Sequence, residues 1–481
     1  MSPPGEPGGR HPRIGLWLGP AAFAATLAIP LPGAGPDAQR MAAVAVLMAC
    51  WWVTEALPLA ATALLPLLLF PVLGLASASE AAAPYADHVI FLFMGGFMLA
   101  RAMQRWGLHR RLALRVVAAV GGGPSRVVLG FMCATAFLSM WVSNTATAAM
   151  MLPIAVAVLA ERGESSPAGS NFGVCLMLGI AYAASIGGMG TLIGTPPNVL
   201  LAGTLQRNYS IEVSFLGWMA FALPVVVAFV PLAWWVLTAW LYPVGDETGT
   251  SRAGVVAERL RALGPMGRGE RSVAALFAAT AAAWTLRPIW TSGIPHGALV
   301  TDSTIAIGCA LALFAWPVGN GQRLLDWEQA AGIPWEALIL FGGGFSLATG
   351  FETSGLSAWL GSRLELIEGA PLPLYLLTVV LGLTLLTEFA SNTAAAAMAL
   401  PVLGAAAVAL GLSPLALCAP AAMAASCAFM LPAATPPNAI LFGSGAFTLP
   451  QMLRAGIAID LIGTLLISSA ALLLLPLVFG S

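Results

Sequence analysis

Charged residues are scarce in this chain. Only 9% of its 481 residues are Asp, Glu, Lys or Arg, whereas a soluble globular domain carries about 25%. The sequence contains no lysine, so all 20 basic residues are arginine, and the formal net charge is −1. A chain with so few charges cannot cover its surface with groups that favour water, and its balanced charge excludes a nucleic-acid partner.

Cysteine is also scarce, and the six cysteines follow no pattern. They are scattered through apolar runs without the CxxC or Cys/His spacings of metal sites and redox motifs. Isolated cysteines in apolar surroundings behave as small buried side chains. We therefore expect neither disulfides nor a metal held by cysteine.

Long apolar runs make up most of the chain. Hydrophobic residues account for 59% of it, and several runs exceed the roughly 18 residues that a helix needs to cross about 30 Å of hydrocarbon. The runs lack the alternation over about 10 residues that marks the strands of a membrane β-barrel. The sequence predicts an all-α polytopic membrane protein, surrounded by the lipid bilayer.

The two halves of the chain repeat each other. Ser143-Asn144-Thr145 recurs as Ser391-Asn392-Thr393 at an offset of 248, and the glycine-containing segment 93–97 recurs at the same offset as 341–345. A constant offset over some 60 residues indicates an internal duplication. A further motif, Thr-Pro-Pro-Asn at 195–198, recurs at 435–438 with an offset of 240.

Both repeated motifs interrupt apolar runs. Pro-Pro cannot continue a helix, and Ser-Asn-Thr sits within runs that are too long for one span, at 126–160 and 373–411. Interrupted backbone at membrane depth is tolerated only where protein or water satisfies it. A single copy would indicate no more than a polar contact between helices or a kink; two matched copies instead favour a binding site for ions and substrate.

Arginine is distributed unequally between the repeats. The stretch 101–115 contains five arginines, while its counterpart 349–363 contains only Arg363. Because cytoplasmic loops are enriched in arginine, the two stretches are expected on opposite sides of the membrane. The repeats are therefore predicted to be inverted, with about eleven transmembrane helices, two re-entrant helical hairpins and two broken helices.

This pattern divides the chain into six parts. They are a cytoplasmic N-terminal tail (1–13), the first helices of repeat 1 (14–121), the hairpin and broken helix of repeat 1 (122–242), a cytoplasmic linker (243–271), the first helices of repeat 2 (272–370), and the hairpin, broken helix and last helix of repeat 2 (371–481).

These motifs together resemble the divalent anion/sodium symporter family, which carries dicarboxylates, citrate or sulfate. Besides the four repeated motifs, Trp-Trp-Val-Thr-Glu-Ala-Leu-Pro at 51–58 is similar to the second helix of that family, so the resemblance covers nearly the whole chain. The resemblance implies a homodimer in which a transport domain (122–242 and 371–481) moves against scaffold helices (14–121 and 272–370). It also implies sodium ions as co-transported cofactors, with no organic cofactor.

The resemblance also implies site residues. The first sodium site would consist of Ser139, Ser143, Asn144 and Gly194. The second would consist of Thr387, Ser391, Asn392, Ala434 and Pro436. The carboxylates of a small anionic substrate would contact Asn144, Thr145, Thr195, Asn392, Thr393 and Pro436.

No arginine or lysine lies near these motifs, so the positive charge that a dianion needs must come largely from sodium. Helix N-termini contribute only about half a unit each. Two acids within predicted spans remain. For Glu388 we weigh a role in proton coupling against a position facing water on the hairpin arm, and favour the second; Asp460 is expected near the cytoplasmic interface with Arg454.

With this resemblance, we expect a sodium-coupled secondary transporter of the bacterial cell (inner) membrane that imports C4-dicarboxylates such as succinate, malate or fumarate by an elevator-type mechanism. The alternatives are a sodium-coupled sulfate or citrate transporter, and a dicarboxylate exchanger without net sodium coupling. An intramembrane hydrolase would need a nucleophile with its base or a metal motif such as HExxH, and the sequence contains neither. We therefore expect no enzymatic activity.

Overall fold

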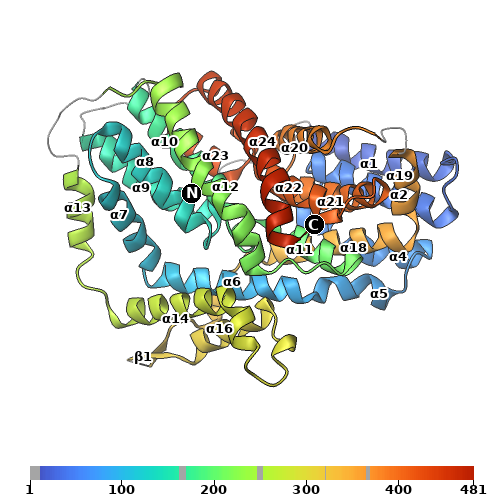
Figure 1. Cartoon of the computed structure of the whole chain (residues 1–481), viewed down its shortest axis with the longest axis horizontal. Coiled ribbons are helices and arrows are strands. Elements are labelled where there is room, and N and C mark those ends of the chain that lie inside the picture. The colour runs from blue at the N-terminus through green and yellow to red at the C-terminus, as the bar shows by residue number, and fades with distance from the viewer. Residues whose placement is uncertain (1–10, 162–169, 246–252, 320, 365–368, 481) are drawn as a thin grey trace.

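The described part of the chain folds into packed helices with one short β-hairpin. The structure is a computed structural model that describes residues 11–161, 170–245, 253–319, 321–364 and 369–480 (Figure 1). The hairpin pairs β1 (Pro317–Gly319) with β2 (Gln322–Arg323) in antiparallel fashion. The predicted tail 1–13 lies largely outside the described residues.

The first half of the chain consists of helices up to the predicted linker. They are α1 (His11–Ala28), α2 (Pro36–Val53), α3 (Leu59–Thr62), α4 (Leu65–Leu73), α5 (Ala78–Ala82), η1 (Ala83–Ala86), α6 (His88–Arg105), α7 (Leu108–Val120), α8 (Pro124–Ser139), α9 (Asn144–Glu161), α10 (Asn171–Gly188), α11 (Pro196–Tyr209), α12 (Phe215–Trp235) and η2 (Val236–Leu241).

The second half adds the remaining helices. They are α13 (Ala253–Ala262), α14 (Arg268–Thr285), α15 (Arg287–Thr291), η3 (Gly297–Leu299), α16 (Asp302–Ala315), α17 (Trp327–Ala330), α18 (Trp335–Thr353), α19 (Leu356–Leu364), α20 (Leu372–Phe389), α21 (Asn392–Ala409), α22 (Pro414–Ala424), α23 (Pro436–Phe442) and α24 (Leu449–Phe479).

The four predicted interruptions are confirmed. One helix ends at Ser139 and the next begins at Asn144, and in the second repeat α20 ends at Phe389 and α21 begins at Asn392. The other two breaks lie between α10 and α11 and between α22 and α23, where the Pro-Pro pairs occupy the first positions of α11 and α23. Proline is favoured there because the first helical N–H groups have no partner within the helix.

Six helical segments among the described residues are long and apolar enough to cross a membrane. They are Ala78–Arg105, Asn171–Gly188, Phe215–Leu241, Leu372–Phe389, Asn392–Ala409 and Leu449–Phe479. The apolar run 59–75 forms two short helices, α3 and α4, and Pro66 lies in the first turn of α4. The total of about eleven spans stays a prediction.

The interrupted helices of the two repeats pack against one another. Helices α9 and α10 contact α23, while α21 and α22 contact α11, so each broken helix lies against the hairpin of the other repeat. Small residues permit close approach within this unit: a Cβ at Gly187 would lie 2.3 Å from the backbone oxygen of Ala136. Close backbone packing of this kind is how helices associate in membranes.

A second group of helices flanks this unit. Helices α14 and α16 pack along α6, and the three lie together in Figure 1. In α7, which follows α6, Arg111 forms an ion pair with Glu270 of α14 at 2.5 Å, and both side chains are buried. This arrangement fixes the helices that the sequence assigned to a scaffold.

Candidate functional site

The first hairpin tip gathers oxygen atoms from three segments. The Ser139 hydroxyl, at the end of α8, donates to the Ala184 carbonyl of α10 at 2.6 Å and lies 2.5 Å from the amide oxygen of Asn144. Ser139 has no exposed surface. The amide oxygen position also lies 3.3 Å from the carbonyl oxygens of Ala184 and Gly194. We call these four groups the first cage.

The orientation of the Asn144 amide decides what the first cage can hold. As placed, its oxygen faces three other oxygens. Turned by 180°, its nitrogen would donate to the same three atoms. Oxygen and nitrogen of an amide are assigned from such partners. In the turned orientation, the amide nitrogen is hydrogen-bonded to the oxygens of the cage. In the orientation as placed, the amide, hydroxyl and carbonyl oxygens converge and can bind a cation.

Glycine is required at two positions around the first cage. A Cβ at Gly188, the last residue of α10, would lie 2.7 Å from the Asn144 amide oxygen. One at Gly194 would lie 2.3 Å from the backbone oxygen of Gly188. Neither position leaves room for a side chain without a shift of the neighbouring atoms. Backbone carbonyls can thus approach the amide closely.

The second hairpin tip repeats this geometry. The Thr387 hydroxyl, near the end of α20, lies 2.9 Å from the Ala425 carbonyl and 2.8 Å from the amide oxygen of Asn392, the first residue of α21. Thr387 is fully buried. We call these groups the second cage. In each repeat a buried hydroxyl thus joins the tip asparagine to a carbonyl of the helix that precedes the break.

The other predicted site residues surround the two cages. Their side chains are exposed at Ser143, Thr145 and Pro436, partly exposed at Ser391, and buried at Thr195, Thr393 and Ala434. Thr195 connects the repeats, because the hydroxyl of Ser426, just after α22, donates to its hydroxyl at 3.4 Å. The two breaks therefore meet inside the protein, where both residues are buried.

The last residue of each Thr-Pro-Pro-Asn motif holds its break in shape. The amide nitrogen of Asn198 donates to the carbonyls ten and seven residues before it at 3.2 and 2.7 Å, and that of Asn438 does the same at 2.9 and 3.0 Å. Both asparagines are fully buried. The carbonyls of Thr191 and Leu431 also accept the backbone N–H groups of Gly194 and Ala434, so each asparagine amide adds to the backbone hydrogen bonds of its break.

The structure thus adds residues that sequence reasoning missed. Ala184 and Ala425 contribute backbone oxygens, which any residue type could supply, so no sequence signal identifies them. Asn198 and Asn438 were visible within the repeated motif, but their role as clamps depends on where the preceding helix ends. Ser426 has no such signal either, because its partner lies in the other repeat.

The expectation that Glu388 faces water is wrong. Its side chain is only 2% exposed, and its carboxylate accepts the backbone N–H groups of Phe429, Met430 and Leu431 at 2.6, 2.8 and 3.0 Å. Those three residues belong to the unwound segment between α22 and α23. A carboxylate is a strong acceptor for free N–H groups, so burial is compensated by this bonding.

The expected position of Asp460 beside Arg454 is also wrong. Asp460 lies within α24, is 3% exposed and faces the carboxyl group of Glu388 within hydrogen-bonding reach. Arg454 is exposed instead. The error arises because helix periodicity does not say which neighbouring helix faces a side chain.

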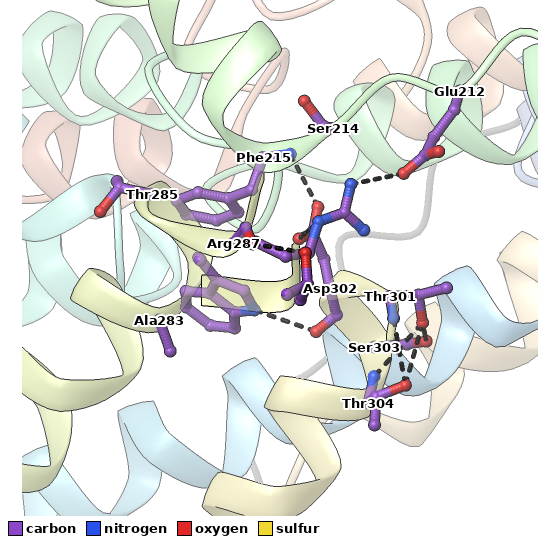
Figure 2. A network of polar contacts seen from close by, with 12 residues as sticks. Glu212, Ser214, Phe215, Ala283, Thr285, Arg287, Thr301, Asp302, Ser303 and Thr304 are labelled. Carbon is purple, nitrogen blue, oxygen red and sulfur yellow. Dashed lines mark hydrogen bonds and ion pairs between the residues drawn. The ribbon is translucent and has the colours of Figure 1, made fainter. Parts of the chain in front are cut away.

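A polar network joins α12 to α15 and α16. Arg287 lies between two carboxylates, 2.6 Å from Glu212 and 3.3 Å from Asp302, as Figure 2 shows. Asp302 also accepts the backbone N–H of Phe215 at 2.7 Å. Because Phe215 begins α12 and Asp302 begins α16, this network connects the helices predicted to move with those predicted to stay.

A second ion pair crosses the same boundary. Arg207 of α11 lies 2.8 Å from Asp87, the N-cap residue of α6. The Asp87 side chain is 6% exposed, whereas the Arg207 side chain is 25% exposed. Together with the network around Arg287, this pair connects the unit of hairpins and broken helices to the flanking helices.

Comparison with known proteins identifies relatives over nearly the whole chain. The model of the sodium:sulfate symporter transmembrane region matches residues 14–479. A sodium-dependent dicarboxylate transporter, SdcS, of Staphylococcus saprophyticus is 41% identical over 477 residues, covering 97% of this chain and 92% of the relative. The transporter of the same name from Staphylococcus aureus is 40% identical with the same coverage.

Solved structures share the fold at low sequence identity. The YdaH transporter of Alcanivorax borkumensis superposes with a TM-score of 0.60 at 15% identity, covering 98% of this chain and 99% of that one. MtrF of Neisseria gonorrhoeae superposes with a TM-score of 0.59 at 13% identity, covering 97% and 95%. At these identities the likeness concerns the fold alone.

Proposed function

This chain belongs to the family of divalent anion/sodium symporters, and on that premise we propose that it imports C4-dicarboxylates together with sodium. The chain is a multi-pass transporter of the cell membrane. The proposal specifies succinate, malate or fumarate as substrates and sodium as the driving ion. It draws on the name of the staphylococcal relatives, which are sodium-dependent dicarboxylate transporters.

The observation that carries the proposal is the matched pair of cages. Each contains a buried hydroxyl, an asparagine amide and a helix carbonyl, all neutral oxygen ligands. Neutral oxygens suit a sodium ion, which needs no proton exchange in order to bind. A proton-coupled carrier would instead need a titratable group at each such site.

The two hairpin tips also suit a carboxylate group of the substrate. Helices α9 and α21 begin at Asn144 and Asn392, so their free N–H groups point toward the tips. Two half-charges cannot neutralise a dianion, since each helix N-terminus supplies only about half a unit. Sodium in the neighbouring cages would supply the remaining charge, which couples the binding of anion and cation.

We assign movement to the unit of hairpins and broken helices. This unit comprises 122–242 and 371–481, and its partner would be the scaffold of 14–121 and 272–370 in a homodimer. The contacts between α9, α10 and α23 and between α11, α21 and α22 support a single unit. In an elevator-type movement, the ion pair between Asp87 and Arg207 would break and re-form.

Uptake into liposomes tests the function. Purified protein is expected to accumulate radiolabelled succinate when sodium is high outside, and to stop when choline replaces sodium. Asn144→Ala and Asn392→Ala should each lose nearly all uptake, because each removes the amide from one cage. Asn171→Ala is the matched control, since this exposed asparagine donates to the carbonyl of Pro243, outside both cages.

Three results would contradict the proposal. Full uptake by either Asn144→Ala or Asn392→Ala would show that the cages are not the site. Uptake of sulfate or citrate in preference to succinate would support the other substrates of the family. Succinate uptake that ignores sodium and requires dicarboxylate inside the liposomes would identify an exchanger.

A further inference from the structure

Several arginines on one side of the protein have no partner. Among the residues that the structure describes, four exposed arginines near the ends of α7, α13 and α14 form no ion pair or hydrogen bond through their side chains: Arg110, Arg261, Arg268 and Arg271. We call these four residues the arginine cluster. They belong to segments that the distribution of arginine predicts to be cytoplasmic.

The arginines of the opposite, predicted outer side all have partners. Three form ion pairs with carboxylates, and the fourth donates to a backbone carbonyl. The pairs are Arg40 with Asp37 at 3.0 Å, Arg207 with Asp87 at 2.8 Å and Arg287 with Glu212 at 2.6 Å, while Arg363 donates to Pro32. The cytoplasmic enrichment in arginine explains on which side the cluster lies, but not why its members lack partners.

A buried ion pair holds the cluster together. Arg111 of α7 lies 2.5 Å from Glu270 of α14 and also donates to the carbonyl of Gly264, just after α13, at 2.8 Å. These bonds join the three segments that carry the cluster. Arg110 precedes Arg111 in the chain and Arg271 follows Glu270, so two exposed arginines flank the buried pair. Because the pair neutralises itself, the positive charge of this junction is that of the cluster.

The other two members of the cluster lie at the same junction. The N–H of Gly264 donates to the carbonyl of Arg261 at 2.9 Å, so Arg261 is within one turn of the carbonyl that the buried pair uses. Arg268 lies three residues before Arg271, on the same face of α14. Within the described part of the chain, Glu258 of α13 is exposed but forms no ion pair with any of them. Four positive charges from three segments are thereby held close together.

Helix α7 has the pattern of a helix that lies along a membrane surface. Its 13 residues are too few to cross about 30 Å of hydrocarbon. Leu112 and Val116 are half-buried on the face that also carries the exposed Arg115. Basic amphipathic helices of this kind place their apolar side chains at the acyl chains and their arginines among the headgroups. The arginine cluster therefore lies at the level of the lipid phosphates.

The geometry points to a binding site for the headgroup of an anionic phospholipid, formed by the arginine cluster. Guanidinium groups bind phosphate oxygens through paired N–H donors, and the lipid supplies the negative charge that the protein does not. The pair of Arg111 and Glu270 is a positioning contact, because it brings the arginines together before the lipid binds and so lowers the cost of ordering them. A lipid bound here bridges α13 and α14 to α7, which packs against the hairpin helix α8.

Lipid titration of the purified full-length protein in detergent tests the site. The ligand is phosphatidylglycerol, whose headgroup is negatively charged, and the unfolding temperature is the readout. Phosphatidylethanolamine with the same acyl chains has no net charge, and glycerol 3-phosphate has the phosphate without acyl chains. Phosphatidylglycerol is expected to raise the unfolding temperature, whereas the other two are not. The measurement involves no sodium, substrate or transport, so its result is independent of the proposed function.

Two double variants locate the binding. An arginine near an anionic membrane surface contributes about fivefold in affinity, so Arg110→Gln combined with Arg271→Gln should raise the phosphatidylglycerol concentration for half-maximal stabilisation about 30-fold. Arg126→Gln combined with Arg454→Gln is the matched control. It removes the same charge from two exposed arginines outside the junction, without a partner among the described residues, and should leave the titration as in the wild type.

Four results would overturn the lipid site. An equal weakening in both double variants would reduce the effect to overall charge. Unchanged phosphatidylglycerol binding when Arg110 and Arg271 are replaced would exclude the cluster. Equal stabilisation by phosphatidylethanolamine would show that the charge of the headgroup is not recognised. Equal stabilisation by glycerol 3-phosphate would identify a site for free phosphate groups that needs no lipid.

Discussion

Gly188→Ala tests the first cage without removing any of its oxygen atoms. Gly188 ends α10, and an added Cβ would lie 2.7 Å from the amide oxygen of Asn144 and 3.0 Å from its nitrogen. Ordinary contact begins at 3.4 Å, so the amide must move by about 0.7 Å. Metal sites tolerate deviations of about 0.2 Å in ligand distance. The substitution should therefore remove Asn144 from the coordination of sodium.

The expected magnitude follows from the loss of one ligand. A hydrogen bond or dipole interaction with a charged group contributes about 1.5–3 kcal/mol. This loss corresponds to a reduction in sodium affinity of about 10- to 150-fold. The effect should be confined to the first cage, because position 428, the counterpart of Gly188 at the offset of 240, is already an alanine.

The assay is the sodium concentration that gives half-maximal succinate uptake in liposomes. Gly188→Ala should raise this concentration while leaving some uptake at the highest sodium concentrations. Gly382→Ala is the control, since a Cβ at this position on α20 meets no atom within 4 Å. The unfolding temperature without sodium should be similar in both variants, which separates a sodium effect from a folding defect.

A wild-type sodium dependence in Gly188→Ala would refute the reasoning. It would mean that Asn144 does not coordinate the ion, or that the cage opens widely enough during transport to accept a methyl group. An equal change in Gly382→Ala would show that the assay responds to any added methyl group in the hairpins.

Three further predictions concern the breaks, the movement and the topology. Asn438→Ala removes the amide donor from the carbonyls of Ala428 and Leu431, of which only Leu431 keeps a backbone donor, the N–H of Ala434, so it should cost about 1–3 kcal/mol and lower the unfolding temperature in detergent; an unchanged temperature would contradict the role of this clamp. In a cysteine-free background, a short bifunctional thiol reagent that joins cysteines placed at Asp87 and Arg207 should stop uptake; undiminished transport by cross-linked protein would exclude an elevator-type movement. Single cysteines at Ser362 and Arg110, both exposed, should react with an impermeant reagent only from outside and only from inside, respectively, and labelling from the same side would disprove the inverted repeats.

The sequence predicted the helices and their interruptions well because local chemistry decides them. Ser-Asn-Thr and Thr-Pro-Pro-Asn within apolar runs predicted four breaks that the structure confirms, including those after Ser139 and Phe389. The duplication also predicted that the two tips would resemble each other. Their matching hydrogen bonds, from Ser139 to Ala184 and from Thr387 to Ala425, agree with that expectation.

The acids show where local reasoning fails. Glu388 and Asp460 lie on different helices, far apart in the sequence, and each alone is compatible with an interface position. Only the packing of α20 and α24 brings them together, and only the end of α22 leaves the N–H groups of residues 429–431 free for Glu388. Hydrophobic periodicity carries no information about which helices become neighbours.

The sequence by itself determined the fold class, the membrane location, the family and the four breaks, because each depends on residue type and spacing. The tertiary structure alone decided which backbone carbonyls complete the cages, how Asn198 and Asn438 hold the breaks, and which buried acids meet. Every residue carries a carbonyl oxygen, so its use as a ligand leaves no trace in the sequence. Its position is set by where a helix ends and what packs against that end.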